Sequence, residues 1–153
     1  DIDIFNYLLE SQPDTYHSFL GRSLHKDRED YADILLRYKK TNAFLQVNWL
    51  TPIKIRILNI TGTKGYAELN FITQDLKLYK NNYTTDYNDF GEFVIKFGHP
   101  VEEAVAIEKK EPLKLQLESF LKHIQGDYVQ IMSVEDSLLA VKLALDILKK
   151  GER

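Results

Sequence analysis

Two cations in the stretch 48–65 are the first candidates for binding a ligand. Lys54 and Arg56 alternate with the isoleucines of 53–57, in the period-two pattern of a strand covered on one face. Side chains two residues apart on a strand point the same way, so this pair could hold a phosphate or carboxylate group. The alternative is an ion pair with Glu68 across a hairpin, which the spacing favours at about two to one.

Two further side chains are candidates for contacting a ligand. Trp49 could stack on a ring, although the apolar parity of its predicted strand face favours core packing. Arg28 lies with Asp30 in the charge run 25–30, which could close over a ligand at a domain boundary. A run of this kind is by default a solvated loop.

Several other kinds of site are excluded. The seven glycines nowhere form the G-x-G-x-x-G turn that brings a backbone close to a pyrophosphate, and 62–65 is favoured as a hairpin turn over a phosphate loop at about nine to one. The four histidines show no ligand spacing, and the chain contains no cysteine. We therefore expect neither a metal nor a cofactor site within this chain.

The elements that must position these residues are expected to form an antiparallel-rich sheet. Strands are predicted at 16–24, 31–38, 43–50, 53–60 and 92–97. A further strand is expected to resume at 66 after the turn at 62–65, and the alternation recurs at 76–79. Residues 81–89 lack periodicity and are expected to form a loop. One strand parity is mostly apolar and should face packed helices; it contains Leu45, Val47, Trp49, Ile53, Ile55, Ile57, Ala67, Leu69, Phe71, Leu76 and Leu78.

The opposite parity is rich in tyrosine and long polar side chains but still contains Leu58 and Ile60. Such a face suits a subunit interface better than bulk solvent. We predict that it mediates oligomerisation through Gln46, Arg56, Tyr66, Glu68 and Tyr79.

Three helices are expected. The first runs from Ile2 to Glu10, the second begins at Pro112 and ends near Gly126, and the third follows a capping pattern at Ser133. The expected buried stripes are Leu113, Leu117, Phe120, Leu121 and Ile124 in the second helix, and Leu138, Val141, Leu145 and Leu148 in the third. The predicted fold class is α+β, an antiparallel-rich mixed sheet with helices packed on one face and an open face used for oligomerisation.

Composition places limits on the class of protein. The length of 153 residues is typical of a single domain. The net charge of -3 does not favour binding to nucleic acid or to acidic lipid. No apolar run is long enough to span a membrane. We expect a cytoplasmic protein.

The stretch Trp49–Gly65, of pattern W-L-T-P-x-K-x-R-x-L-x-I-x-G-T-x-G, resembles a sheet hairpin in the C-terminal domain of the glucose-fructose oxidoreductase, inositol dehydrogenase and MocA family. Residues 1–9 resemble the helix that follows this family's catalytic histidine, and 133–136 resemble the start of its last helix. The resemblance implies that 1–153 is the C-terminal substrate-binding and oligomerisation domain of an NAD(P)-dependent sugar or nucleotide-sugar dehydrogenase. It also implies that the dinucleotide-binding Rossmann domain, with the catalytic lysine and histidine, lies upstream of residue 1.

The same resemblance gives Asp3 a possible catalytic role. When the chain is aligned on the family motif D-x-G-x-H-x-x-D, Asp3 occupies the position of the last aspartate. A carboxylate there could orient the histidine or accept a hydrogen bond from a substrate hydroxyl. The alternative is that Asp3 only complements the helix dipole. NAD or NADP would bind the parent enzyme rather than this chain, and Lys54, Arg56, Arg28 and Trp49 would contact the sugar substrate. The alternative function is a free-standing, non-catalytic dimer that binds a ligand or a protein partner through its sheet.

Overall fold

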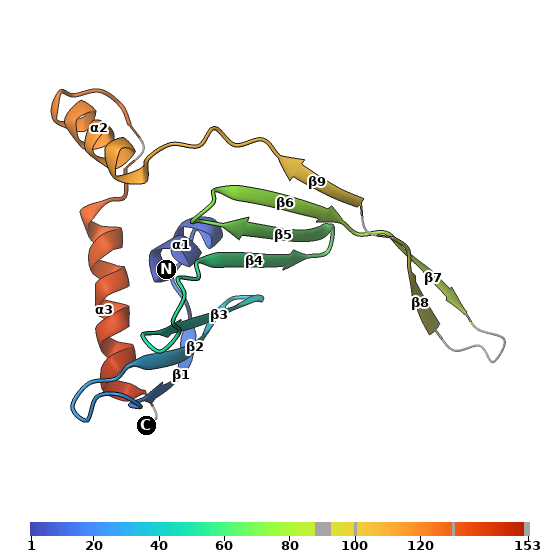
Figure 1. The fold of residues 1–153 in the computed structure, drawn as a ribbon, viewed down its shortest axis with the longest axis horizontal. Helices are drawn as coiled ribbons and strands as arrows, with labels where there is room; N and C mark the ends of the chain where they lie inside the picture. Colours follow the sequence, from blue (N-terminus) through green and yellow to red (C-terminus); the bar gives the residue numbers. More distant parts are fainter. Residues whose placement is uncertain (88–92, 100, 130, 152–153) are drawn as a thin grey trace. The chain divides into compact units, whose positions relative to one another are not determined.

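The computed structural model describes residues 1–87, 93–99, 101–129 and 131–151, and it confirms the α+β class (Figure 1). Every strand pairing in this part of the chain is antiparallel. The elements are α1 (Ile2–Leu9), β1 (Thr15–Gly21), β2 (Tyr31–Tyr38), β3 (Thr41–Asn48), β4 (Ile57–Gly62), β5 (Gly65–Asn70), β6 (Asp75–Lys80), β7 (Tyr83–Tyr87), β8 (Phe93–Phe97), β9 (Val101–Val105), α2 (Pro112–Ile124) and α3 (Val134–Lys150).

The chain divides into two compact units. The first contains residues 1–53 and 118–153, and the second contains residues 54–117. The first unit holds the sheet β1-β2-β3, and the second holds the sheet β4-β5-β6-β9 and the ribbon β7-β8. Each unit is described by itself below.

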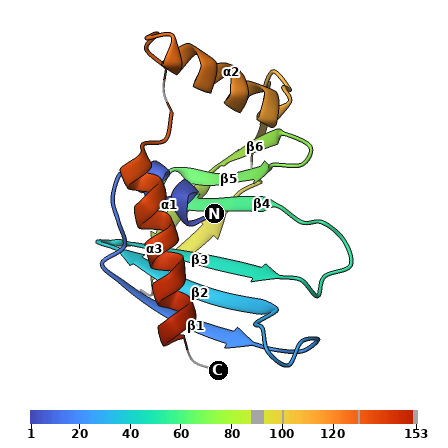
Figure 2. The ribbon, with the colours of Figure 1, turned by 90° about the vertical axis from the view of Figure 1, so that its left-hand side faces the viewer.

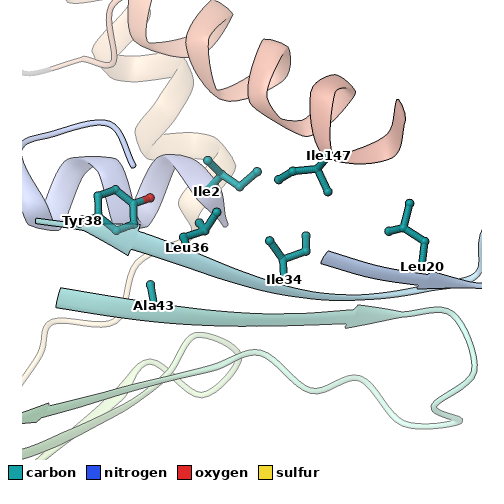
Figure 3. Close-up of a cluster of buried hydrophobic side chains, with 7 residues drawn as sticks. All are labelled: Ile2, Leu20, Ile34, Leu36, Tyr38, Ala43 and Ile147. Atoms are coloured by element: carbon teal, nitrogen blue, oxygen red, sulfur yellow. The ribbon is translucent and has the colours of Figure 1, made fainter. Parts of the chain in front are cut away.

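The core of the first unit lies between one face of its sheet and the helices α1 and α3 (Figures 2 and 3). Leu36 of β2 is fully buried, with Ile34 of the same strand beside it. Ile2 comes from α1 and Ile147 from α3, so the two ends of the chain meet over this strand. The expected packing of helices on one sheet face is therefore found in this unit.

The other face of this sheet carries no helix of the unit and exposes large apolar side chains. Antiparallel register aligns Phe19 with Asp33 and Gln46, and aligns Leu35 with Phe44. Phe19, Leu35 and Phe44 are 59%, 45% and 62% exposed. We call these three residues the outer patch.

The hairpin β4–β5 turns where the sequence predicts it. Gly62 pairs with Gly65, so only Thr63 and Lys64 lie between the strands. Hairpin turns often need glycine because they require a positive φ. That reason does not apply here, because neither Gly62 nor Gly65 adopts a positive φ. A Cβ at Gly65 would lie 2.4 Å from the carbonyl oxygen of Tyr79 on β6, so the strand spacing itself requires glycine.

The predicted start of the central strand is wrong. β4 begins at Ile57, and residues 53–56 precede it without strand structure. The hairpin register then places Leu58 on one face with Leu69 and Leu76, and Ile57 on the other face with Asn70. Leu58 therefore lies on the apolar face of this sheet, contrary to the predicted parity.

Two strands were not predicted. β7 lies within the segment 81–89 that was expected to be a loop, of which residues 88 and 89 fall outside the described part, and β9 completes the larger sheet beside β6. Both segments are rich in charged, threonine or tyrosine residues, so the period-two apolar signal is weak.

The helices begin and end near their predicted positions, but their buried faces differ from those expected. The Ser133 hydroxyl accepts the backbone N–H of Asp136 at 3.0 Å, which confirms the cap of α3, and Gly126 has φ +89° after α2. In α3 the residues packed on the core are Ala140, Leu143 and Ile147. The predicted stripes stay exposed in both helices, and α2 buries no residue.

Candidate functional site

A buried carboxylate organises the loop between β1 and β2. The Asp30 side chain is 1% exposed and accepts backbone N–H groups of Ser23 at 2.8 Å, Leu24 at 2.5 Å and His25 at 3.3 Å. The bond from Leu24, with those from Ser23 and His25, lowers the pKa of this carboxyl. Asp30 is therefore a structural anchor and not a group on a solvated loop.

The same residue joins the loop to the end of β3. The Asp30 backbone N–H donates to the Gly21 carbonyl at 2.9 Å, and the Asp30 carbonyl accepts the Trp49 N–H at 2.8 Å. An ion pair between Arg22 and Glu29 at 2.7 Å closes the loop from the other side. Arg28 is exposed on this loop. The Asp30 carbonyl holds the backbone of Trp49, another predicted substrate-binding residue.

Trp49 does not pack in the core. Its side chain is 85% exposed, because β3 ends at Asn48 and the strand parity no longer applies at the next residue. The Asn48 side-chain oxygen accepts the backbone N–H groups of Leu50 and Thr51, which turns the chain at this point. An exposed tryptophan held on a fixed turn is suited to stacking on a ring.

Lys54 and Arg56 lie in the segment that precedes β4. They are exposed, and the argument that they share a strand face does not apply, because this segment is not a strand. The carbonyl of Arg56 accepts the Phe71 N–H at 3.0 Å, which fixes its backbone at the sheet edge. The hairpin register places Asn59 directly opposite Glu68, so neither cation is the cross-strand neighbour of Glu68.

Three of the five predicted interface residues come together in the second unit. Tyr66 and Tyr79 are cross-strand partners whose ring centroids lie 5.7 Å apart. With Glu68 they line a hollow of about 450 Å³, together with Lys80, Asn81, Asn82 and Gly98. Asn81 also donates to the Thr63 carbonyl at 2.9 Å, which ties the hollow to the β4–β5 turn.

Gln46, another predicted interface residue, lies on the outer face of the first unit. Its amide donates to the Asp33 carboxylate at 2.9 Å. Both side chains line a hollow of about 540 Å³ with Ser23, Tyr31, Asn48, Leu50, Thr51 and Pro52. Tyr31 and Asp33 were missed by the sequence reasoning, although their place opposite Asn48 and Gln46 follows from the 31–48 hairpin.

Asp3, the predicted catalytic carboxylate, lies in the first turn of α1. An acidic residue here complements the positive end of the helix. The side chain is 43% exposed, so it can reach a group outside the helix.

Within the residues that the structure describes, no group of three or more His, Cys, Asp or Glu side chains could hold a metal ion. No helix in this part of the chain is long and apolar enough to cross a bilayer.

The fold recurs in solved structures of a dehydrogenase and of an NAD-binding protein. The UDP-N-acetylglucosamine 3-dehydrogenase GnnA from Acidithiobacillus ferrooxidans matches 99% of this chain with a TM-score of 0.79 and 19% identity. An NAD-binding protein from Listeria innocua matches 98% with a TM-score of 0.69 and 17% identity. No protein-family model and no curated protein sequence matches the chain.

The chain spans less than half the length of these neighbours, covering 44% of GnnA and 46% of the Listeria protein. At this level of identity the likeness establishes the fold. The chain therefore has the α+β fold of a region that makes up less than half of these longer proteins.

Proposed function

We propose that this chain is the substrate-binding and oligomerisation domain of an NAD(P)-dependent sugar or nucleotide-sugar oxidoreductase. In the parent enzyme a hydride would pass from a ring carbon bearing a hydroxyl group to nicotinamide. The observation that carries the proposal is the match of 99% of this chain to 44% of a nucleotide-sugar dehydrogenase. The remaining length of such a protein would supply the dinucleotide-binding Rossmann domain, preceding this chain, and its bound NAD or NADP.

Trp49 and Arg28 form the substrate side of the proposed site in the first unit. Trp49 supplies an exposed ring that a sugar could stack on, and Arg28 supplies a permanent cation suited to a phosphate or carboxylate. The hydrogen bond from the Trp49 N–H to the Asp30 carbonyl holds the Trp49 backbone before a ligand arrives. Such preorganisation lowers the entropic cost of binding.

Lys54 and Arg56 provide a second pair of cations on the segment before β4. We assign them to the charged part of the substrate. The exposure of Lys54 supports this role, since a cation that is solvated in the free protein can exchange water for a phosphate oxygen.

Asp3 would support catalysis without transferring the hydride or the proton itself. The proposed proton carrier is a histidine upstream of residue 1, and a carboxylate near one turn of helix away could orient its ring. The position of Asp3 in the first turn of α1, with an accessible carboxylate, supports this role.

The open sheet faces would join copies of the chain into a homo-oligomer. The outer patch and Gln46 lie on the same face of the first unit, and Tyr66, Glu68 and Tyr79 surround one hollow in the second. Exposed aromatic groups rimmed by polar side chains are typical of subunit interfaces. Arg56 completes the proposed interface set.

The test uses the full-length polypeptide that contains this chain. We expect it to reduce NAD or NADP when UDP-N-acetylglucosamine or a related sugar is added, whereas residues 1–153 alone show no turnover. The Asp3→Asn variant should lower kcat by about 100-fold, the low end of acid–base effects. Absence of both NAD(P) binding and turnover in the full-length protein, with association retained, would favour the non-catalytic dimer instead.

A further inference from the structure

Helix α3 has two apolar faces, and the residues that the structure describes bury only one of them. Ala140, Leu143 and Ile147 pack on the core of the first unit. A second set of large apolar side chains lies on a different side of the helix, because each residue is rotated by about 100° from the one before it. It consists of Val134, Leu138, Val141, Leu145 and Leu148, which are 79%, 65%, 57%, 50% and 43% exposed. We call this set the α3 stripe.

The spacing of the α3 stripe indicates what kind of element covers it. Its residues are separated by four, three, four and three positions, the spacing that presents one continuous seam to another helix. The seam from Val134 to Leu148 is about 21 Å long at 1.5 Å per residue. Polar residues flank the stripe, among them Lys142, so the apolar surface is narrow and suits one helix.

Helix α2 shows the same pattern independently. Leu113, Leu117, Phe120 and Ile124 are separated by four, three and four positions and are 60%, 55%, 56% and 65% exposed. None of its 13 residues is buried. A helix of this length is marginal in water without tertiary packing, so its apolar side must be covered in the functional protein.

The length of the structural neighbours indicates which part of the protein covers the α3 stripe. More than half of each neighbouring chain lies outside the region that matches this fold. A domain in the same polypeptide is present at a high effective concentration and can cover such a seam permanently. Nucleotide-binding α/β domains carry helices on both outer faces of their sheet, so they offer the helix that the seam requires.

We propose that the α3 stripe is the docking surface for a helix of the nucleotide-binding domain of the same polypeptide. This inference rests on the proposed function for the identity of that domain. It adds the surface through which the two domains are held together, and it explains why α3 is apolar on two sides.

Thiol labelling of the full-length polypeptide tests the docking surface without any enzymatic readout. This chain contains no cysteine, so the Leu145→Cys variant introduces one thiol here, and Lys142→Cys on the polar side of α3 is the matched control. Each labelling rate with a maleimide is followed on the peptide containing that position and divided by its rate in denaturant, which removes differences in intrinsic reactivity. We expect the Leu145→Cys variant to react at least about tenfold more slowly than the Lys142→Cys variant in the folded protein.

Equal normalised rates would overturn the proposal. Slow labelling that becomes fast when the protein is diluted to its monomer would also overturn it, because the occupant would then be a second copy. If the Leu145→Cys variant fails to fold, Val141→Cys replaces it on the same stripe. NAD(P) binding by the same samples is measured separately, so protection without NAD(P) binding would retain a docked domain while rejecting the proposed oxidoreductase.

Discussion

At the scale of single residues, Asp30 shows how one side chain can position others. Its carboxylate satisfies three backbone N–H groups of the loop before β2, and its own backbone groups bond Gly21 and Trp49. A buried carboxylate is stable only when its charge is matched by hydrogen bonds, and here the backbone supplies them. Asp30 thus ties residues 23–25 to its carboxylate and the end of β3 to its carbonyl.

The lowered pKa of Asp30 predicts an acid-sensitive loop. A carboxyl whose pKa is lowered by folding stabilises the fold above its unfolded pKa of 3.8, and this contribution is lost as the pH falls through the lower folded value. The Asp30→Asn variant should lower Tm by several degrees at neutral pH, with the difference from wild type shrinking below about pH 4. Emission from Trp49, the only tryptophan here, reports on the same loop.

The control for this prediction is Asp27→Asn, an exposed aspartate of the same loop. It should leave Tm and the Trp49 emission unchanged. A neutral effect of Asp30→Asn, or an equal effect of both substitutions, would contradict the anchoring role.

At the scale of elements, the β4–β5 hairpin depends on close approach between strands. Gly65 faces the backbone of Tyr79, whereas a Cβ at Gly62 would find only the Gly65 carbonyl oxygen, at 3.7 Å. The two glycines pair with each other across the turn but have different reasons to be glycine.

Alanine substitution should separate these two reasons. Gly65→Ala forces a backbone shift against β6 and should lower the free energy of unfolding by about 1–3 kcal/mol. Gly62→Ala makes an ordinary van der Waals contact and should change it by less than about 0.5 kcal/mol. Urea denaturation of both variants measures the difference, and similar losses would argue that the turn, not the approach to β6, requires glycine.

At the scale of the whole molecule, the buried core belongs to one of the two units. The buried hydrophobic residues of the described chain all lie in 1–53 or 118–153, and the second unit exposes much of its apolar surface. A domain with so much exposed apolar surface is expected to bury it against partners. The proposed parent enzyme provides two such partners, a nucleotide-binding domain and further copies of the chain.

Association through the outer patch is the corresponding prediction. Phe44→Glu places a charge among Phe19 and Leu35 and should weaken self-association of the full-length protein by about tenfold or more. Lys40→Glu, in the exposed turn between β2 and β3, is the control and should leave association unchanged. Sedimentation over a concentration series measures both, and a Phe44→Glu protein that associates like wild type would remove the outer patch from the interface.

Local patterns in the sequence were sufficient for the elements whose signals are themselves local. The turn between Tyr38 and Thr41, the Ser133 cap, Gly126 after α2 and the Gly62–Gly65 hairpin all lie where the sequence predicts them, because each depends on residues within a few positions. The α+β class followed from their order.

Only the tertiary structure decided which faces are buried and which residues are anchors. The periodicity of α3 allows two apolar stripes, and packing against the first unit's sheet selects Ala140, Leu143 and Ile147 over the predicted one. Strand parity assigned Trp49 to the core, but β3 ends one residue earlier. The role of Asp30 arises only when the loop closes and brings the backbone N–H groups of Ser23 and Leu24 to its carboxylate. Backbone donors are present at every residue, so such partners leave no pattern in the order of amino acids.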